Sequence, residues 1–273
     1  MRDTVNQRLR RVTSPQNALL RQMRRAFHQG TLTEDGYCAI ESVRIIEEAI
    51  RSGLRFKAVI FSDSASHDDG SAHRLLPQIG SHVETVVIPD AVFTTVVATE
   101  NPQGVAALVK LKECSLDGVL AQPNPLILVA VGLQDPGNLG AILRSAEAFG
   151  VHAVLLAEGS VSPYNAKVVR ASAGSLFRCC LAQENLASAL PLLRHHGLRL
   201  VATSARKGRP LHKAQLAGPL ALFIGNEGTG LSSETLAKLD EAVMVPHSPA
   251  VESLNAAVAA SIVLYEIARQ RSH

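Results

Sequence analysis

Three short segments in the second half of the chain, 138–150, 223–231 and 245–264, hold the residues best suited to chemistry. Each places glycines, uncharged polar side chains or an isolated charge where a strand pattern gives way to a loop or a helix. In an α/β protein the ligand crevice lies at such points, outside the carboxyl ends of the strands. We therefore expect the functional site there.

The first segment presents Asn138 at the start of a predicted helix, 139–149, and Arg144 less than two turns later. The apolar residues of this helix account for its buried side, so Arg144 is expected to point elsewhere. A guanidinium offers five donors in a planar fork that fits a phosphate, and it stays charged at any ordinary pH. Arg144 is thus a candidate phosphate ligand, and a surface salt bridge is the competing interpretation.

The second segment follows the predicted strand 220–224 and reads Gly-Asn-Glu-Gly-Thr-Gly from Gly225. Its glycines permit positive φ angles and close approach of a ligand to the backbone. The spacing G-x-x-G-x-G differs from the dinucleotide fingerprint G-x-G-x-x-G, which makes a nicotinamide dehydrogenase the poorest interpretation. Glu227 is either part of a site or a solvated loop carboxylate.

The third segment is a loop, 246–252, followed by a predicted helix from 253 to 270. Ser253 is suited to cap that helix, because its hydroxyl can accept a backbone N–H bond. Asn255 would then lie in the first turn, where Asn is a poor helix former. The alanines that follow make the helix thin, which suits packing against another helix or a second subunit.

The elements that must position these segments alternate along the chain, and the continuous apolar strands of the second half predict a parallel sheet covered on both faces. The first half predicts strands at 37–40, 58–61, 83–88 and 104–109, helices at 15–27, 43–51 and 90–97, and a polar loop at 62–71. The second half predicts strands at 126–131, 153–156, 198–203, 220–224 and 242–245, and helices at 139–149, 167–173, 186–195, 233–239 and 253–270. We expect an α/β protein with a first domain at 1–111, a linker at 112–124 and a second domain at 125–273.

Length and composition indicate a globular protein, with 273 residues of which 47% are hydrophobic. The longest apolar runs are far below the roughly 20 residues that span a bilayer, and the basic N-terminus lacks the apolar stretch of a signal peptide. We expect a cytoplasmic protein without a membrane contact. None of the four cysteines stands in a CxxC pair and the histidines have no ligand spacing, so free thiols and no metal site are expected.

The net charge of +3 hides an asymmetry, because residues 1–33 hold seven arginines, Arg2 and Arg8 included, against one acid. Arg21, Arg24 and Arg25 lie three and four apart on one helix face, a cationic stripe suited to phosphates or a merely solvated face. With no Trp and 4% aromatic residues, there is little for base stacking, so any RNA contact would rely on backbone charge and shape.

Taken together, NLGAILRSAEAFG, LFIGNEGTGLS and VPHSPAVESLNAAVAASIVLYE resemble the three motifs of the SpoU/TrmH family of SPOUT-class RNA 2′-O-ribose methyltransferases. Their order and distances match, and the resemblance covers 126–271. The first 110 residues look like the small ribosomal-protein-like RNA-binding domain of the rRNA-modifying branch, on the strength of ESVRII at 41–46 and NPQGV at 101–105. Ser42 stands where that branch more often has glycine.

The resemblance implies a parallel α/β catalytic domain with a C-terminal trefoil knot, an exception to the rule that chains do not knot. It implies S-adenosylmethionine as methyl donor, S-adenosylhomocysteine as product, and a homodimer paired through the first and last helices of this domain. The cofactor positions fall on Thr203, Gly225, Val245 and Leu254, and the essential arginine and other site residues on Arg144, Asn138, Glu227, Ser253 and Asn255.

The implied reaction is in-line attack of a ribose 2′-OH on the sulfonium methyl, in which alignment of the substrates carries much of the rate. Arg144 as the base and Arg144 as a phosphate ligand stay equal alternatives, since an arginine pKa above about 12 opposes proton removal. The substrate is expected to be 23S rRNA. A tRNA methyltransferase, an antibiotic-resistance rRNA methyltransferase and a non-catalytic RNA-binding or ribosome-assembly protein stay as alternatives.

Overall fold

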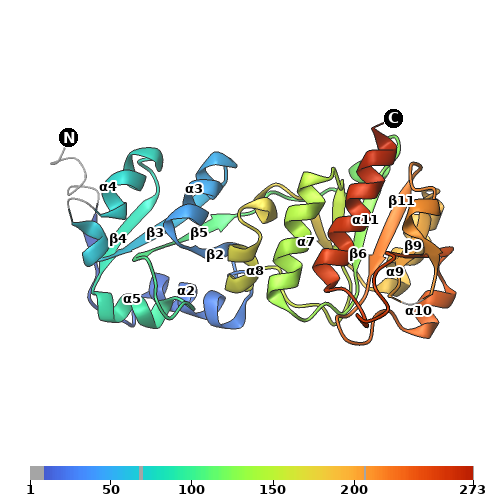
Figure 1. The fold of residues 1–273 in the computed structure, drawn as a ribbon. Coiled ribbons are helices and arrows are strands. Elements are labelled where there is room, and N and C mark those ends of the chain that lie inside the picture. Colours follow the sequence, from blue (N-terminus) through green and yellow to red (C-terminus); the bar gives the residue numbers. More distant parts are fainter. Residues whose placement is uncertain (1–8, 68–69, 206, 273) are drawn as a thin grey trace. The chain divides into compact units, whose positions relative to one another are not determined.

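The computed structural model describes residues 9–67, 70–205 and 207–272, drawn as a ribbon in Figure 1. Arg2 and Arg8 of the basic N-terminal segment lie outside the described residues. The chain forms two compact units, the first made of Met1–Lys112 with Ser162–Phe177 and the second of Glu113–Val161 with Arg178–His273. Within the described part of the chain, no helix is long and apolar enough to cross a membrane.

The first unit is built on a five-stranded mixed sheet in the order β1-β4-β3-β5-β2. Strands β3 and β4 are parallel, while β5 runs antiparallel to both β3 and β2. The strands are β1 (Arg10–Arg11), β2 (Cys38–Glu41), β3 (Arg55–Ser62), β4 (Glu84–Ile88) and β5 (Val105–Lys110), and the helices are α2 (Ala18–Gln29), α3 (Val43–Arg51), η1 (Ser64–Ser66), α4 (Ser71–Leu75), η2 (Leu76–Gln78), α5 (Asp90–Val96), α8 (Ala166–Ala171) and η3 (Ser175–Phe177). The predicted loop at 62–71 therefore contains the short helix η1, and β1 and α4 escaped prediction.

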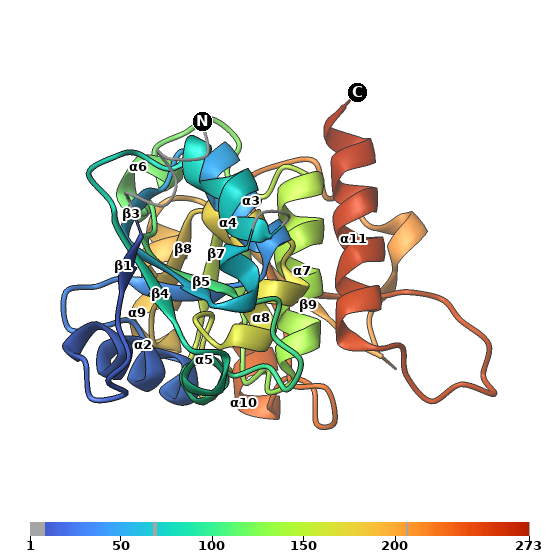
Figure 2. The same ribbon diagram turned by 90° about the vertical axis from the view of Figure 1, so that its left-hand side faces the viewer.

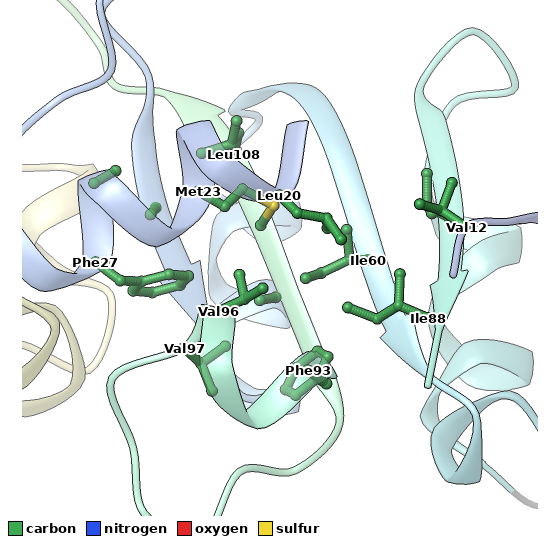
Figure 3. Packing of buried hydrophobic residues seen from close by; sticks show 14 of the residues in the cluster. Val12, Leu20, Met23, Phe27, Ile60, Ile88, Phe93, Val96, Val97 and Leu108 are labelled. Carbon is green, nitrogen blue, oxygen red and sulfur yellow. The ribbon is translucent and has the colours of Figure 1, made fainter. Parts of the chain in front are cut away.

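Helices α2 and α5 cover one face of this sheet. Figure 3 shows Leu20, Met23 and Phe27 of α2 together with Phe93 of α5 and Ile60 of β3, all buried in one apolar cluster. Helix α2 begins where the Asn17 side chain accepts the Leu19 N–H, and it ends at Gly30 in the left-handed conformation. Both caps are ordinary helix-end chemistry.

Helix α8 comes from the second half of the sequence but belongs to the first unit, contrary to its expected place in the second domain. Its Arg170 forms an ion pair with Glu41, which is only 4% exposed, and donates a hydrogen bond to the Thr99 hydroxyl at 2.7 Å. A buried carboxylate requires such a cation, because an unpaired charge would lose its hydration without compensation. Ser42, next in sequence, has a φ of 83°, which explains why glycine would suit that position.

The second unit is a seven-stranded sheet in the order β10-β12-β9-β11-β6-β7-β8, and every neighbouring pair is parallel, as expected. The strands are β6 (Leu126–Ala130), β7 (Ala153–Leu156), β8 (Leu181–Gln183), β9 (Arg199–Thr203), β10 (Arg209–Pro210), β11 (Leu220–Ile224) and β12 (Glu241–Met244). The helices are α6 (Leu116–Leu120), α7 (Pro136–Ala148), α9 (Leu186–His195), η4 (Leu211–Lys213), α10 (Ser233–Ala237) and α11 (Ala256–Arg271). The short edge strands β8 and β10 were not predicted.

Helices α6 and α9 pack with one face of this sheet, through residues such as Val119 and Leu193 against Val129 and Phe223. Helices α7 and α11 lie side by side in both Figure 1 and Figure 2, on the other face. Because α7 precedes α11 by more than a hundred residues, this packing joins the first and third sequence segments. The expected tight packing of the alanine-rich helix is realised against α7.

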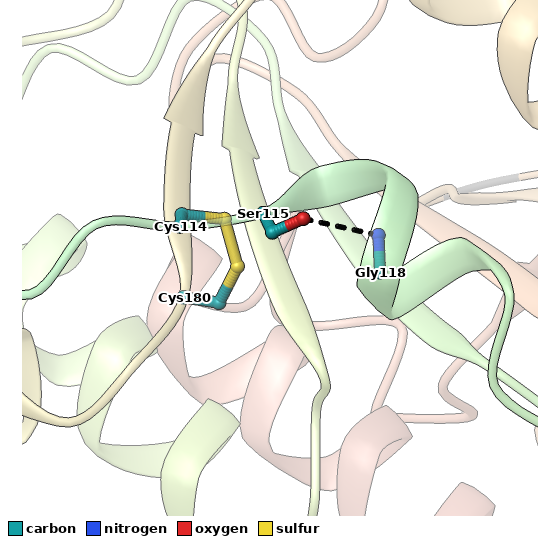
Figure 4. The surroundings of a disulfide bond; sticks show 4 residues. All are labelled: Cys114, Ser115, Gly118 and Cys180. Carbon is teal, nitrogen blue, oxygen red and sulfur yellow. Dashed lines mark hydrogen bonds between the residues drawn. A yellow bond between two sulfur atoms is a disulfide. The ribbon is translucent and has the colours of Figure 1, made fainter.

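Two expectations about this unit are wrong. The predicted linker contains α6, whose Val119 and Leu120 are buried in the core. Cys114 and Cys180 form a disulfide with their Cα atoms 4.8 Å apart (Figure 4), so only Cys38 and Cys179 are free thiols. The two paired cysteines are 66 residues apart, and no local sequence pattern predicts a contact at that distance.

Candidate active site

A cavity of about 610 Å³ lies at the carboxyl ends of the adjacent strands β12, β9 and β11. Its volume is within the range of roughly 300–1,000 Å³ that small-molecule sites occupy. Six of the predicted residues line it: Thr203, Gly225, Glu227, Val245, Ser253 and Leu254. The four predicted cofactor positions therefore share one cavity, and two of the other predicted site residues join them there.

The loop that begins at Gly225 forms one wall of this cavity, and there is no room for a side chain at Gly225 itself. A Cβ on Gly225 would lie 2.4 Å from both Gly230 C and Leu231 N, far closer than atoms approach. Asn226 closes the loop, because its Oδ1 accepts the Gly228 and Thr229 N–H groups at 2.9 and 3.1 Å. This organising role of Asn226 was missed, although an Asx turn is its sequence signal.

His247 is a second cavity residue that the sequence analysis missed. Its Nδ1 lies 2.8 Å from the Val245 carbonyl oxygen. Since a carbonyl can only accept, Nδ1 carries the proton of this hydrogen bond. The Thr203 hydroxyl donates to the Phe223 carbonyl at 3.2 Å, which holds the end of β9 against β11.

Three side chains from the three segments are joined in a chain of hydrogen bonds beside this loop. Glu227 Oε1 accepts from Asn138 Nδ2 at 3.1 Å, and Asn138 Oδ1 accepts from Asn255 Nδ2 at 2.9 Å. Glu227 also accepts the N–H groups of Gln134 and Asp135 at 3.2 and 3.0 Å, at the start of α7. The carboxylate thus ties the glycine loop to the N-terminus of α7.

The net effect of these contacts is to lower the pKa of Glu227. Desolvation raises its pKa, but the hydrogen bonds from Asn138 and from the Asp135 and Gln134 backbone outweigh that effect. All of these donors prefer the ionised form. Glu227 is therefore a carboxylate at neutral pH, and a poor proton acceptor.

Asn255 is the N-cap of α11, which corrects the prediction that Ser253 would cap and that Asn255 would lie in the first turn. Its Oδ1 accepts the Ala257 and Val258 N–H groups at 2.9 and 3.2 Å. With a ψ of 140°, Asn255 is outside the helix, so its low helix propensity has no cost there. Ser253 is exposed and lines the cavity instead.

Arg144 is exposed, lines no part of the cavity, and has no hydrogen bond or ion pair among the residues that the structure describes. Asn138 bonds to Asn255, the N-cap of α11, and Ser145 bonds to Ser261 within α11 at 2.7 Å. Arg144 is one residue before Ser145 and is therefore turned by about 100° around the α7 axis from that face. The surface salt bridge considered for Arg144 is absent from this structure's described residues.

The predicted RNA-contacting arginines of α2 differ in their surroundings. Arg24 donates to the Thr95 carbonyl and hydroxyl at 3.0 and 3.1 Å, and Arg25 pairs with Glu34 at 3.0 Å. Arg21 is exposed. Across the described ranges, no group of His, Cys, Asp and Glu side chains could hold a metal ion.

Comparison with known families matches both parts of the chain. Residues 125–265 match the SpoU rRNA Methylase family, and residues 28–107 match the MRM3-like substrate binding domain. The first match ends at Tyr265, and it contains all three sequence segments and every residue that lines the cavity.

Similar proteins extend over nearly the whole chain. An uncharacterized tRNA/rRNA methyltransferase of Synechocystis is 35% identical over 95% of this chain and 94% of its own. The 23S rRNA (guanosine(2553)-2′-O)-methyltransferase RlmP of Bacillus subtilis is 29% identical over 95% and 99%.

Solved structures agree with these matches. The crystal structure of the SpoU methyltransferase AviRb from Streptomyces viridochromogenes in complex with AdoMet has a TM-score of 0.80 and is 26% identical over 94% of this chain and 99% of its own. A crystal structure of an RNA 2′-O ribose methyltransferase has a TM-score of 0.76 at 31% identity, over 96% and 100%. The parallel sheet, the three motifs and these likenesses agree, and the chain belongs to the SpoU rRNA methylase family.

Proposed function

We propose that this protein transfers a methyl group from S-adenosylmethionine to a ribose 2′-OH of RNA, with 23S rRNA as the substrate. The observation that carries the proposal is the cavity formed by the glycine loop, bordered by the Glu227–Asn138–Asn255 hydrogen bonds. Two similar proteins support it, since AviRb was crystallised in complex with the cofactor AdoMet and RlmP is named for a 23S rRNA guanosine.

The cavity fits a methyl donor of this kind. The close backbone packing at Gly225 leaves main-chain groups, rather than side chains, to form that wall. We assign Thr203, Gly225, Val245 and Leu254 to cofactor binding. When bound, S-adenosylmethionine supplies an electrophilic methyl group, and its transfer to the ribose oxygen leaves S-adenosylhomocysteine.

The amides of Asn138 and Asn255 position the ribose in this proposal. Each Nδ2 carries two hydrogens, and one of each is used in the network, toward Glu227 and Asn138 respectively. The second hydrogen of each amide is a donor whose direction is set by the network. Glu227 acts through Asn138 as a positioning residue, and Ser253 offers a hydroxyl to the same cavity.

Arg144 binds the RNA phosphate next to the target ribose, because a planar guanidinium fits a phosphate and stays protonated. The 2′-OH proton then passes to a phosphate oxygen or to solvent. Because Arg144 lies outside the amide network and outside the cavity lining, we propose that a second copy of the chain supplies its Arg144 to this site.

The face of α11 that remains exposed supports this homodimer. Val258, Ile262 and Tyr265 are 49%, 37% and 57% exposed, and their spacing of four and three residues places them on one side of the helix. Tyr265 also contacts Phe149 at the end of α7, with ring centroids 5.9 Å apart. We propose that this apolar face of α7 and α11 pairs with its copy, which brings Arg144 to the interface.

Further parts of the proposal follow from family membership. We propose a trefoil knot in the C-terminal part and a cytoplasmic location. We also propose that the domain expected at 1–111 binds RNA and that the domain expected at 125–273 catalyses methyl transfer, with Ser162–Phe177 counted in the first of these units. An experimental density map in which the chain is traced from β11 to α11 would test the knot.

The test is methyl transfer from labelled S-adenosylmethionine to unmodified transcripts of 23S rRNA and of tRNA, followed by mapping of 2′-O-methylated riboses. One methylated site in 23S rRNA is expected. Methylation of tRNA alone would favour the tRNA alternative, and calorimetry without S-adenosylmethionine binding would favour an assembly protein. Sedimentation should show a dimer that Ile262→Asp dissociates.

A further inference from the structure

A cluster of basic side chains surrounds Tyr37 at one end of the first unit's sheet. Lys57 Nζ lies 5.3 Å and Lys110 Nζ 5.7 Å from the centroid of the Tyr37 ring, within cation–π range. Arg55 stands directly opposite Lys110 in the pairing of β3 with β5. We call Tyr37, Arg55, Lys57 and Lys110 the Tyr37 cluster.

These side chains share the face that α2 covers. Opposite residues of an antiparallel pair point to the same side of a sheet, so Arg55 lies beside Lys110. Lys57 stands at the register shift between Phe56 and Ala58, and its ammonium bonds to Gln22 of α2 at 3.1 Å. A bulge of this kind re-aims a side chain.

Two features show that the positive charge of this cluster is not balanced by acidic side chains. Arg55 and Lys110 are like charges directly opposite each other, an arrangement that destabilises a sheet. Arg55 is exposed and has no acidic partner among the residues that the structure describes.

The cluster already holds one anion of the chain itself. The Asp35 carboxylate pairs with Lys57, and the Asp35 carbonyl accepts from Lys110 Nζ at 3.3 Å. Its side chain is 54% exposed, so this carboxylate sits at the surface, where another anion can replace it. One carboxylate against three cations leaves an excess of two positive charges.

We propose that the Tyr37 cluster is a phosphate-binding surface for RNA, with Asp35 occupying the position that a backbone phosphate takes in the complex. This surface differs from the α2 arginine stripe, where Arg24 and Arg25 are held by Thr95 and Glu34. The Tyr37 ring fixes the two ammoniums, which lowers the cost of ordering them on binding. The inference rests on the proposed RNA methyltransferase function and names the surface by which the first unit holds its substrate.

The test is filter binding of the full-length protein to an unmodified 23S rRNA transcript across a series of salt concentrations. Lys57→Ala/Lys110→Ala should weaken binding at least tenfold. The slope of log K against log[salt] should become shallower by about 1–2, since each lost phosphate contact removes about 0.7–0.9 from it. Arg10→Ala/Arg51→Ala removes two exposed, paired cations of the same unit and should change affinity less than threefold.

Asp35→Asn should have the opposite effect on affinity. Removing the carboxylate charge frees the lysines for the RNA phosphate, so RNA binding should tighten severalfold. Unchanged or weaker binding in Asp35→Asn, or a loss confined to Arg21→Ala, would overturn the proposal. Thermal melting checks that each variant is folded. Wild-type protein that binds the transcript but transfers no methyl group would count against the proposed function, not against this surface.

Discussion

Glu227 and Asn138, 89 residues apart in sequence, are joined by a 3.1 Å hydrogen bond from the amide to the carboxylate. Asn138 in turn accepts from Asn255, so one carboxylate orients two amides that come from different segments. Desolvation raises the pKa of Glu227, but the hydrogen bonds from Asn138 and from the Asp135 and Gln134 N–H groups outweigh it and lower the pKa overall, so Glu227 serves as a fixed acceptor. In the proposed mechanism this carboxylate therefore positions the two amides and accepts no proton.

Glu227→Gln should lower the rate of methyl transfer about 100-fold, as misplacement by an ångström can do. The amide of glutamine would turn a donor toward the N–H groups of Gln134, Asp135 or Asn138, which the carboxylate now accepts. Single-turnover kinetics measure the effect. Glu184→Gln, a change at an exposed acid of the same unit, should be neutral; equal rates in both variants would contradict the positioning role.

Arg144→Ala should abolish methyl transfer and change S-adenosylmethionine affinity less than threefold, because Arg144 does not line the cavity. Arg144→Lys keeps the charge but loses the fork, so partial activity is expected. Radiolabel transfer and calorimetry separate the two effects. Full activity in Arg144→Ala would remove this residue from the mechanism.

Mixed dimers decide whether Arg144 serves the partner's site. When Arg144→Ala and Glu227→Gln protomers are mixed, about half of the dimers are mixed, and each would hold one intact site, restoring about a quarter of wild-type activity. An arginine that serves its own protomer would restore none. The restored activity of the mixture is therefore the measurement.

Gly225→Ala should eliminate S-adenosylmethionine binding and lower the free energy of unfolding by about 2–3 kcal/mol, the usual cost of overpacking. The added methyl group would meet backbone atoms of Gly230 and Leu231 that cannot move aside. Gly218→Ala meets no atom within 4 Å and serves as the control. Calorimetry and urea unfolding test both variants, and normal binding by Gly225→Ala would refute the cradle.

His152 should make the protein less stable as the pH falls below about 6.5, its ordinary pKa. Desolvation, and then the charge of Arg271, lower the pKa of folded His152, which accepts the Leu126 N–H at 3.0 Å through Nδ1. The unfolded chain therefore binds the proton first, and stability is lost from the unfolded pKa down to the folded pKa. His152→Asn keeps an acceptor without titrating, so urea unfolding between pH 7.5 and 5.5 should show a smaller loss.

The cysteines should label in an order set by pairing and burial. Burial raises the pKa of Cys38 to about 12, and burial followed by the charge of Glu147 raises that of Cys179 to about 11, so both should react slowly in the folded protein. Unfolding without reductant should expose these two, and reductant should add Cys114 and Cys180. Mass spectrometry after alkylation counts them; four labels without reductant would exclude the disulfide.

The sequence alone determined the class of the second unit and the edge at which its site lies. Continuous apolar strands such as 220–224 predict a buried parallel sheet, and polar segments after them predict the crevice. Hydrophobic periodicity is read from neighbouring residues alone. Helices such as α3 and α9 were therefore predicted with the bounds that the structure shows. The three motifs identified the family because they carry the site's chemistry in order.

Only the tertiary structure decided which of these residues meet. Asn138 and Asn255 are 117 residues apart, and Cys114 and Cys180 are 66 apart, and neither contact has a local pattern. The packing of α7 on α11 brings the amides of Asn138 and Asn255 together and leaves Arg144 outside their hydrogen-bond network. In the first unit, the ion pair with the buried Glu41 holds Arg170 and its helix α8. Hydrophobic periodicity shows which side of an element is buried, but the partner it is buried against depends on the whole chain.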